Sequence, residues 1–219
     1  MTETQSKTVK LDIMADPICP WCYIGKAELD RALATVPEHP FVIEFHPFQL
    51  NPEMPRGGMD RRTYLETKFG GKENAAAAYA PMVERAEALG LPLDLAAMTR
   101  TPNTLDAHRL IHWAGIEGLQ YEVVDALFHA YFAEGRDIGD AEVLSDIADS
   151  VGMDAAVIHK LLASDADCEA IRARDAHSRD MGITSVPTFI VAGQHAVPGA
   201  QPAELWQKVM EEIGEQLSR

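Results

Sequence analysis

Two of the three cysteines in the chain are separated by only two residues, in the run Cys19-Pro-Trp-Cys22. The run follows Val9–Met14, whose alternation of apolar and polar residues is typical of a half-buried strand, and it precedes a helical pattern that continues to about Leu33. A pair of cysteines that opens a helix directly after a first strand indicates thiol–disulfide redox chemistry.

The position of each residue in this run suggests a separate role. The sulfur of Cys19 would face the unpaired N–H groups of the first helical turn, whose partial positive charge stabilises a thiolate nucleophile. Pro20 would occupy the first helical position, where a missing N–H costs nothing. We expect Cys22, one turn further, to stay protonated until it resolves a mixed disulfide, and Trp21 to be an exposed apolar platform for substrate.

Other interpretations of these residue types involve a metal or plain packing. The cysteine pair could be half of a zinc site, but only Cys168 remains and scattered histidines would be needed, and a third interpretation is two small buried residues without chemistry. His108 and His112 are four residues apart on one predicted helix, a spacing that zinc can use with Asp106 or Glu117 as a third ligand. Packing or solvent contact is preferred for both histidines, and we predict no metal.

Two further residues have lesser roles in this interpretation. Asp16 precedes Cys19 by three residues, and a hydrogen bond to the turn at Pro17 is favoured over assistance in proton transfer. Cys168, beside Ile171 on a predicted helix, is expected to be a buried free thiol, with regulatory oxidation as the second interpretation.

The elements that position these residues are predicted from hydrophobic periodicity. Phe41–Phe45 is a second strand, and residues 60 to about 181 give helical patterns without a strand candidate. Strands return at Thr188–Ala192 and His195–Val197, and the connection Gly193-Gln194 favours a type II′ turn. The expected helices cover residues 61–69, 75–89, 104–114, 121–133, 141–150, 154–163, 165–181 and 202–217.

The element order resembles that of a known family. Cys-Pro-Trp-Cys after a first strand and Val186-Pro187-Thr188 before a terminal hairpin resemble the thioredoxin superfamily, and the helical block between them resembles its DsbA-like disulfide oxidoreductases. Segments similar to the cytoplasmic FrnE-type branch lie at residues 16–26, 47–52, 103–111, 131–138, 182–189 and 199–202. The resemblance covers about residues 10–205.

The resemblance implies an α/β thioredoxin fold with a large all-helical insertion. The thioredoxin-like domain would be discontinuous, formed by residues 8–55 and 165–219, and the insertion would span residues 56–164. It also implies that the Val186–Pro187 bond is cis, although only about 5–6% of such bonds are cis in general. Val186 and Pro187 would then bind substrate beside the nucleophile Cys19, together with Pro20 and Trp21. Cys22 would be the resolving thiol.

The activity implied is thiol–disulfide exchange with protein or low-molecular-weight thiols. No bound cofactor is needed, and glutathione is a candidate co-substrate. The related kappa-class glutathione transferases and 2-hydroxychromene-2-carboxylate isomerases typically have serine near the position of Cys19. Both cysteines are present here, which argues against that chemistry, but residues 103–108 still resemble those proteins. A glutathione-dependent transferase or isomerase is therefore kept as an alternative, and a non-enzymatic, chaperone-like binding protein is another.

Composition restricts the partners. The chain of 219 residues has 19 Lys and Arg against 34 Asp and Glu, a formal charge of −15. Such a charge disfavours nucleic acid and anionic membrane surfaces as partners. There is no apolar run of about 18 residues and no signal-like N-terminus, and three cysteines suit a reducing compartment, so we expect a cytoplasmic protein. The oligomeric state and the direction of electron flow are left open.

Overall fold

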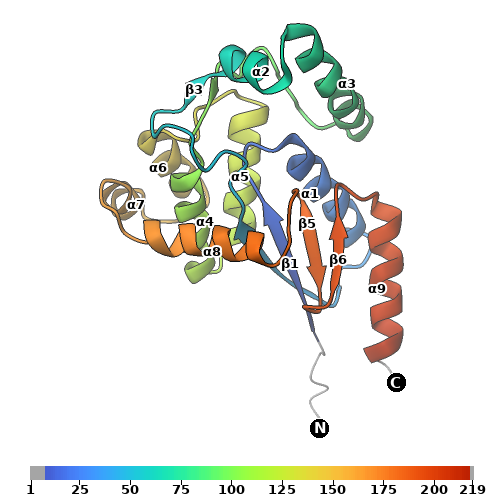
Figure 1. Ribbon diagram of the computed structural model, residues 1–219. Coiled ribbons are helices and arrows are strands. Elements are labelled where there is room, and N and C mark those ends of the chain that lie inside the picture. The colour runs from blue at the N-terminus through green and yellow to red at the C-terminus, as the bar shows by residue number, and fades with distance from the viewer. Residues whose placement is uncertain (1–7, 218–219) are drawn as a thin grey trace.

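The computed structural model describes residues 8–217, which form a four-stranded sheet surrounded by helices (Figure 1). The strands lie in the order β2-β1-β5-β6. The strand β1 is parallel to β2 and antiparallel to β5, and β5 pairs with β6 as a hairpin. Their bounds are β1 Val9–Ala15, β2 Phe41–Pro47, β5 Thr188–Val191 and β6 His195–Pro198.

Parallel neighbours such as β1 and β2 need a crossover, and the helix α1 supplies it. Helix α1 packs against α9, while α8 packs against β2 and α4. The helices are α1 Pro20–Leu33, α2 Arg61–Phe69, α3 Lys72–Leu89, α4 Leu105–Glu117, α5 Gln120–Phe132, α6 Ala141–Ser150, α7 Ala155–Leu162, α8 Cys168–Asp180 and α9 Ala203–Leu217. The α/β fold with a helical insertion between β2 and α8 is confirmed, whereas the exact domain boundaries stay a prediction.

Two expectations about strands and turns were wrong. A short antiparallel pair, β3 (Met59–Asp60) with β4 (Arg100–Thr101), lies where no strand was expected, at the end of one predicted connector and between two predicted helices, because backbone groups of two adjacent connections satisfy each other there. The hairpin turn is centred on Ala192 and Gly193, with φ of +56° and +68°. Positive φ at both central residues is the pattern of a type I′ turn, with glycine in the second position rather than the first.

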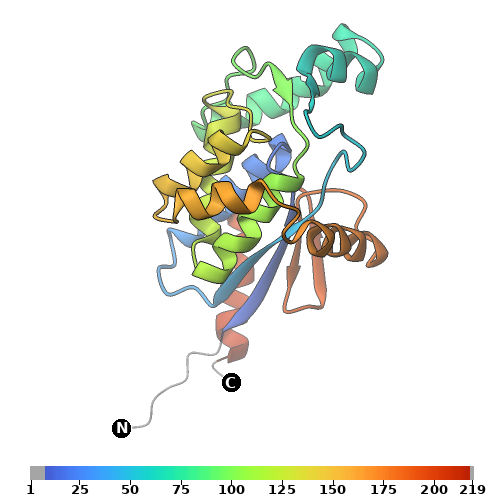
Figure 2. The ribbon, with the colours of Figure 1, turned by 90° about the vertical axis from the view of Figure 1, so that its left-hand side faces the viewer.

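The helical insertion packs beside the sheet (Figure 2), and the two share one hydrophobic core. Tyr23 of α1 stacks on Phe132 of α5, with ring centroids 5.0 Å apart, and it also contacts Phe128. Aromatic pairs of this kind stabilise more than their buried area alone. The insertion is therefore held firmly against the helix that carries the two cysteines. In the described residues, no helix is both long and apolar enough to cross a membrane.

Candidate active site

Cys19 lies at the N-terminus of α1, as the sequence predicts. It is the N-cap residue, with extended backbone angles of −86° and 114°, and Pro20 follows at the start of the helix. Its own N–H donates to the carbonyl of Asp16 at 2.9 Å. Its Sγ lies 3.6 Å from the carbonyl oxygen of Val186, 167 residues away in sequence. The fold thus brings together the two most widely separated parts of the predicted site.

Cys22 lies one turn further along α1 and is only 2% exposed. Burial raises the pKa of Cys22 well above its usual value, and its contact with Cys19 raises it further. Cys19, Cys22 and Cys168 are all free thiols in this structure. Ionisation of Cys22 in the reduced protein therefore requires a nearby group that accepts its proton.

The Val186–Pro187 peptide bond is cis, which confirms the expectation from the family resemblance. The ring of Pro187 packs against Gly25 of α1: a Cβ added at Gly25 would lie 3.0 Å from Cγ of Pro187 and 3.4 Å from Cα of Ala200. A Cβ at this position would be in tight contact, so the neighbouring atoms would have to shift to accept a side chain. Gly25 therefore allows the loop that carries Val186 to lie directly against α1.

A cavity of about 280 Å³ opens at Cys19, between this loop and the insertion. Trp21 is half-buried rather than exposed, because its ring also packs against the hydrophobic core. Of the predicted binding residues, Pro20, Trp21 and Val186 line the cavity, and Pro187 lies behind them against α1. The complete lining is Ile18, Cys19, Pro20, Trp21, Leu50, Arg61, Tyr64, Lys68, Phe69, Tyr79, Met82, Thr101, Tyr131, Thr184, Ser185 and Val186.

The only charged residues in this lining are two cations, Arg61 and Lys68 of α2. Arg61 is 6% exposed, and its guanidinium donates to the hydroxyls of Tyr131 at 2.9 Å and Tyr79 at 3.1 Å. Among residues 8–217, no carboxylate forms an ion pair with Arg61. A buried cation is normally paired, so an anion entering the cavity would complete its environment.

Sequence reasoning missed Arg61, because an isolated arginine in a run of polar residues carries no signal of its own. The net charge of −15 pointed away from a positive site. The cavity is thus positive in a strongly acidic protein, and clefts of one sign raise the local concentration of ligands of the opposite sign.

A fully buried carboxyl, that of Asp16, lies behind the two cysteines. Its Oδ2 accepts from the N–H of Leu50 at 2.6 Å, and Oδ1 accepts from the N–H of Ile18 at 3.5 Å. Burial raises the pKa of Asp16 to about 7, while these hydrogen bonds lower it. The bond to Ile18 is the expected turn contact. The raised pKa makes Asp16 able to exchange a proton near neutral pH.

Comparison with known proteins identifies the family. Residues 10–211 match the family model described as the DSBA-like thioredoxin domain. The chain belongs to this family. A crystal structure of a probable DsbA oxidoreductase from Streptomyces coelicolor is 30% identical, with a TM-score of 0.84, over 94% of this chain and 90% of that one. The family supports an activity in the thiol–disulfide oxidoreductase or isomerase class.

Two other relatives are similar over nearly their whole length. The uncharacterized protein YwbO of Bacillus subtilis is 28% identical over 204 residues, 93% of this chain and 96% of that protein. The fold is also that of the cytosolic disulfide reductase DsbM from Pseudomonas aeruginosa, solved with GSH, which is 20% identical with a TM-score of 0.66 over 94% of this chain and 99% of that one. The similarity to DsbM is one of fold.

The two histidines considered as zinc ligands in this DsbA-like protein do not converge on one point. His108 is buried beside Asp16, whereas the Nδ1 of His112 lies 3.3 Å from the guanidinium of Arg174. Within the described residues, neither belongs to a group of three potential ligands. His112 thus makes a polar contact with Arg174, whereas the Nε2 of the buried His108 has no hydrogen-bond partner among residues 8–217.

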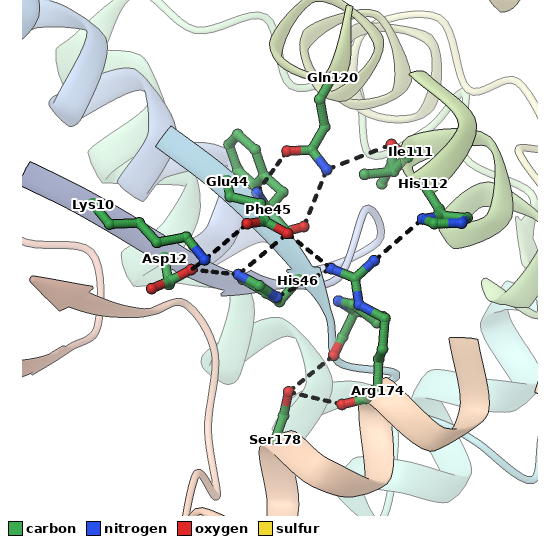
Figure 3. A network of polar contacts seen from close by, with 11 residues as sticks. Lys10, Asp12, Glu44, Phe45, His46, Ile111, His112, Gln120, Arg174 and Ser178 are labelled. Atoms are coloured by element: carbon green, nitrogen blue, oxygen red, sulfur yellow. Dashed lines mark hydrogen bonds and ion pairs between the residues drawn. The ribbon is translucent and has the colours of Figure 1, made fainter. Parts of the chain in front are cut away.

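A different polar cluster, formed by Asp12, Glu44 and His46, has three ligand atoms within 4.8 Å of one another (Figure 3). The ammonium group of Lys10 lies 2.8 Å from Asp12 and 2.9 Å from Glu44, and Arg174 lies 3.2 Å from Glu44. These side chains already neutralise both carboxylates. The network ties α8 to the edge strand β2.

Cys168 is buried, as expected, and is the first residue of α8. It borders a separate cavity of about 270 Å³ that it shares with Asp106, Asp165 and Arg172. This cavity has none of its lining residues in common with the one at Cys19. Cys168 is therefore not part of the dithiol site.

Proposed function

We propose that this protein is a dithiol–disulfide oxidoreductase that exchanges disulfides through Cys19 and Cys22. The observation that carries the proposal is the position of the Cys19 Sγ, at a helix N-terminus, in the cavity and next to the Val186 carbonyl. The helix N-terminus favours the thiolate that attacks a disulfide, and the carbonyl belongs to a loop against which an extended substrate can lie.

The reaction proceeds in two exchanges. The thiolate of Cys19 attacks one sulfur of the substrate disulfide, forms a mixed disulfide and expels the other sulfur as a thiolate, which takes a proton from solvent. Cys22 then gives its proton to the carboxylate of Asp16 and attacks the Cys19 sulfur, which expels the second substrate thiolate. The dithiol loses two electrons and the substrate gains them. The same steps in reverse oxidise a substrate dithiol.

The substrate we favour is a low-molecular-weight disulfide that carries carboxylates, of which glutathione disulfide is the obvious probe. Arg61 and Lys68 support it, since they are the only charges in the cavity lining and both attract carboxylates. A cavity of about 280 Å³ is near the lower limit for a small-molecule site and too small for a folded protein partner. The relative DsbM, solved with GSH, supports the same choice.

Both electrons reside in the two cysteines, so the proposed reaction needs no bound cofactor. We place it in the cytoplasm, where glutathione keeps most thiols reduced. The three free cysteines and the cytosolic relative DsbM support this location.

The test is the reduction of glutathione disulfide by the reduced protein and by three matched variants. Cys19→Ser should abolish the reduction, and Cys22→Ser should stop the reaction at one mixed disulfide per chain. Cys168→Ser is the control and should retain full activity, because it borders a different cavity. Activity that requires added glutathione but survives Cys22→Ser would instead favour a glutathione-dependent transferase or isomerase.

A further inference from the structure

A buried ring nitrogen beside the active site, Nε2 of His108, has no hydrogen-bond partner within the described part of the chain. His108 belongs to α4 of the insertion and is 3% exposed. Its Nε2 lies 3.8 Å from Oδ1 of Asp16, slightly longer than a hydrogen bond. Buried polar atoms are rarely left unpaired, so this nitrogen calls for a functional explanation.

The hydrogen-bond donors around Asp16 show that its ionised form has partners and its protonated form lacks an acceptor. The N–H groups of Leu50 and Ile18 donate to its oxygens, and Thr104 lowers the pKa of its carboxyl. These donors satisfy an ionised carboxylate. When Asp16 takes up a proton, its new O–H needs an acceptor, and Nε2 of His108 is the unpaired nitrogen that faces it.

The protonation states near pH 7 fit such a pair. Burial lowers the pKa of His108 to about 4, so its ring is neutral and one nitrogen keeps a free lone pair. Burial raises the pKa of Asp16 to about 7. Two residues of α8 act on the pKa of His108 in opposite directions: Asp175 raises it and Arg174 lowers it. His46 of β2 lines a cavity of about 10 Å³ together with His108.

We propose that His108 is a positioning residue for the resolving step, in which its Nε2 accepts the O–H that Asp16 gains from Cys22. This inference rests on the proposed function. The S–H bond of Cys22 breaks, its proton moves to Asp16, and its electron pair forms the bond to the Cys19 sulfur. The bond between Cys19 and the substrate sulfur breaks at the same time, and the substrate leaves as a thiolate that solvent protonates.

Backbone hydrogen bonds hold Asp16 and Cys22 close together, since the N–H of Cys19 donates to the carbonyl of Asp16 at 2.9 Å and the N–H of Cys22 donates to the carbonyl of Cys19 at 3.0 Å. The residue that holds the transferred proton thus comes from the thioredoxin-like part, and the residue that stabilises the protonated form comes from the insertion. The insertion would therefore contribute to the chemistry as well as to the cavity wall.

The experiment loads Cys19 with a chromophoric aromatic thiol and follows its release by Cys22 in stopped flow, from about pH 5 to 9. In His108→Leu the protonated form of Asp16 loses its acceptor, so its pKa falls. The midpoint of the rate profile should move down by about half to one pH unit. In His108→Gln a side-chain carbonyl can replace the acceptor, and the midpoint should return close to its original value.

His112→Leu is the matched control, one helical turn away, and should leave the midpoint unchanged because His112 contacts Arg174 instead of Asp16. An unchanged midpoint in His108→Leu, or an upward shift, would overturn the inference, the latter because it would mean that His108 donates to the carboxylate. If Cys19→Ser still reduces disulfides, the proposed function itself fails. If Cys19→Ser is inactive and only the midpoint shift is missing, the role of His108 alone is wrong.

Discussion

Replacement of Arg61 by glutamine tests whether the cavity recognises a carboxylate. The variant removes the buried charge, while the glutamine amide can still donate to one of the two tyrosine hydroxyls that Arg61 contacts. A hydrogen bond to a charged group contributes about 1.5–3 kcal/mol. We therefore expect kcat/KM for glutathione disulfide to fall roughly 10- to 150-fold, since each 1.4 kcal/mol is a factor of ten.

The assay compares this anionic substrate with a neutral one, hydroxyethyl disulfide, under the same conditions. The neutral disulfide has no carboxylate for Arg61 to bind, so its kcat/KM should change by less than about threefold. Added salt should lower kcat/KM of the wild-type protein for glutathione disulfide, because salt screens the attraction of the anion to the cavity. The difference between the wild-type protein and Arg61→Gln should therefore become smaller as salt is added.

Arg62→Gln provides the control, since Arg62 is the next residue of the same helix but is exposed and pairs only with Glu66. It should leave both substrates nearly unaffected. An equal loss for the neutral and the anionic substrate in Arg61→Gln would refute the reasoning, because it would indicate damage to the cavity rather than loss of a charge contact. Thermal unfolding of each variant shows whether the fold is retained.

Three further predictions concern the cysteines and their helix. Iodoacetamide should modify Cys19 fastest in the reduced protein, because Cys19 starts a helix that has no acidic residue in its first turn. The helix that begins at Cys168 has an acidic residue there. Equal modification rates of the cysteines, measured by mass spectrometry, would contradict the role of Cys19 as nucleophile. In Cys22→Ser a glutathione adduct should accumulate, visible as a mass increase that dithiothreitol removes, and its absence would argue against thiol exchange. Gly25→Ala should destabilise the protein by about 1–3 kcal/mol in urea unfolding, because its methyl group meets the ring of Pro187. Gly214→Ala, whose methyl group has no neighbouring atom within 4 Å, should stabilise the protein by about 0.5–1 kcal/mol. Similar effects of both substitutions would disprove the packing argument.

Much of the chain could be predicted because local patterns carry the information. The alternation in β1 and the periodicity of the long helices follow from which side chains face the core, and α2 and α6 begin and end at the predicted residues. The short β3–β4 pair could not be predicted, since two-residue strands have no periodicity and form only because two distant loops meet.

The sequence by itself determined the reactive pair and its setting. The run Cys19-Pro20-Trp21-Cys22 closely follows the first strand and opens a helix, so the proposed nucleophile Cys19 lies at a helix N-terminus. The family resemblance added the cis bond before Pro187, which local base rates alone would have rejected.

Only the tertiary structure decided which groups surround the two cysteines. Asp16, proposed as the proton acceptor, its neighbour His108 and the cation Arg61 come from three segments that no local pattern links. Their properties arise from burial and from the absence or presence of a partner, which depend on how distant elements pack. The sequence places the sulfur atoms, and the packing of the insertion against the sheet sets the charge and proton environment around them.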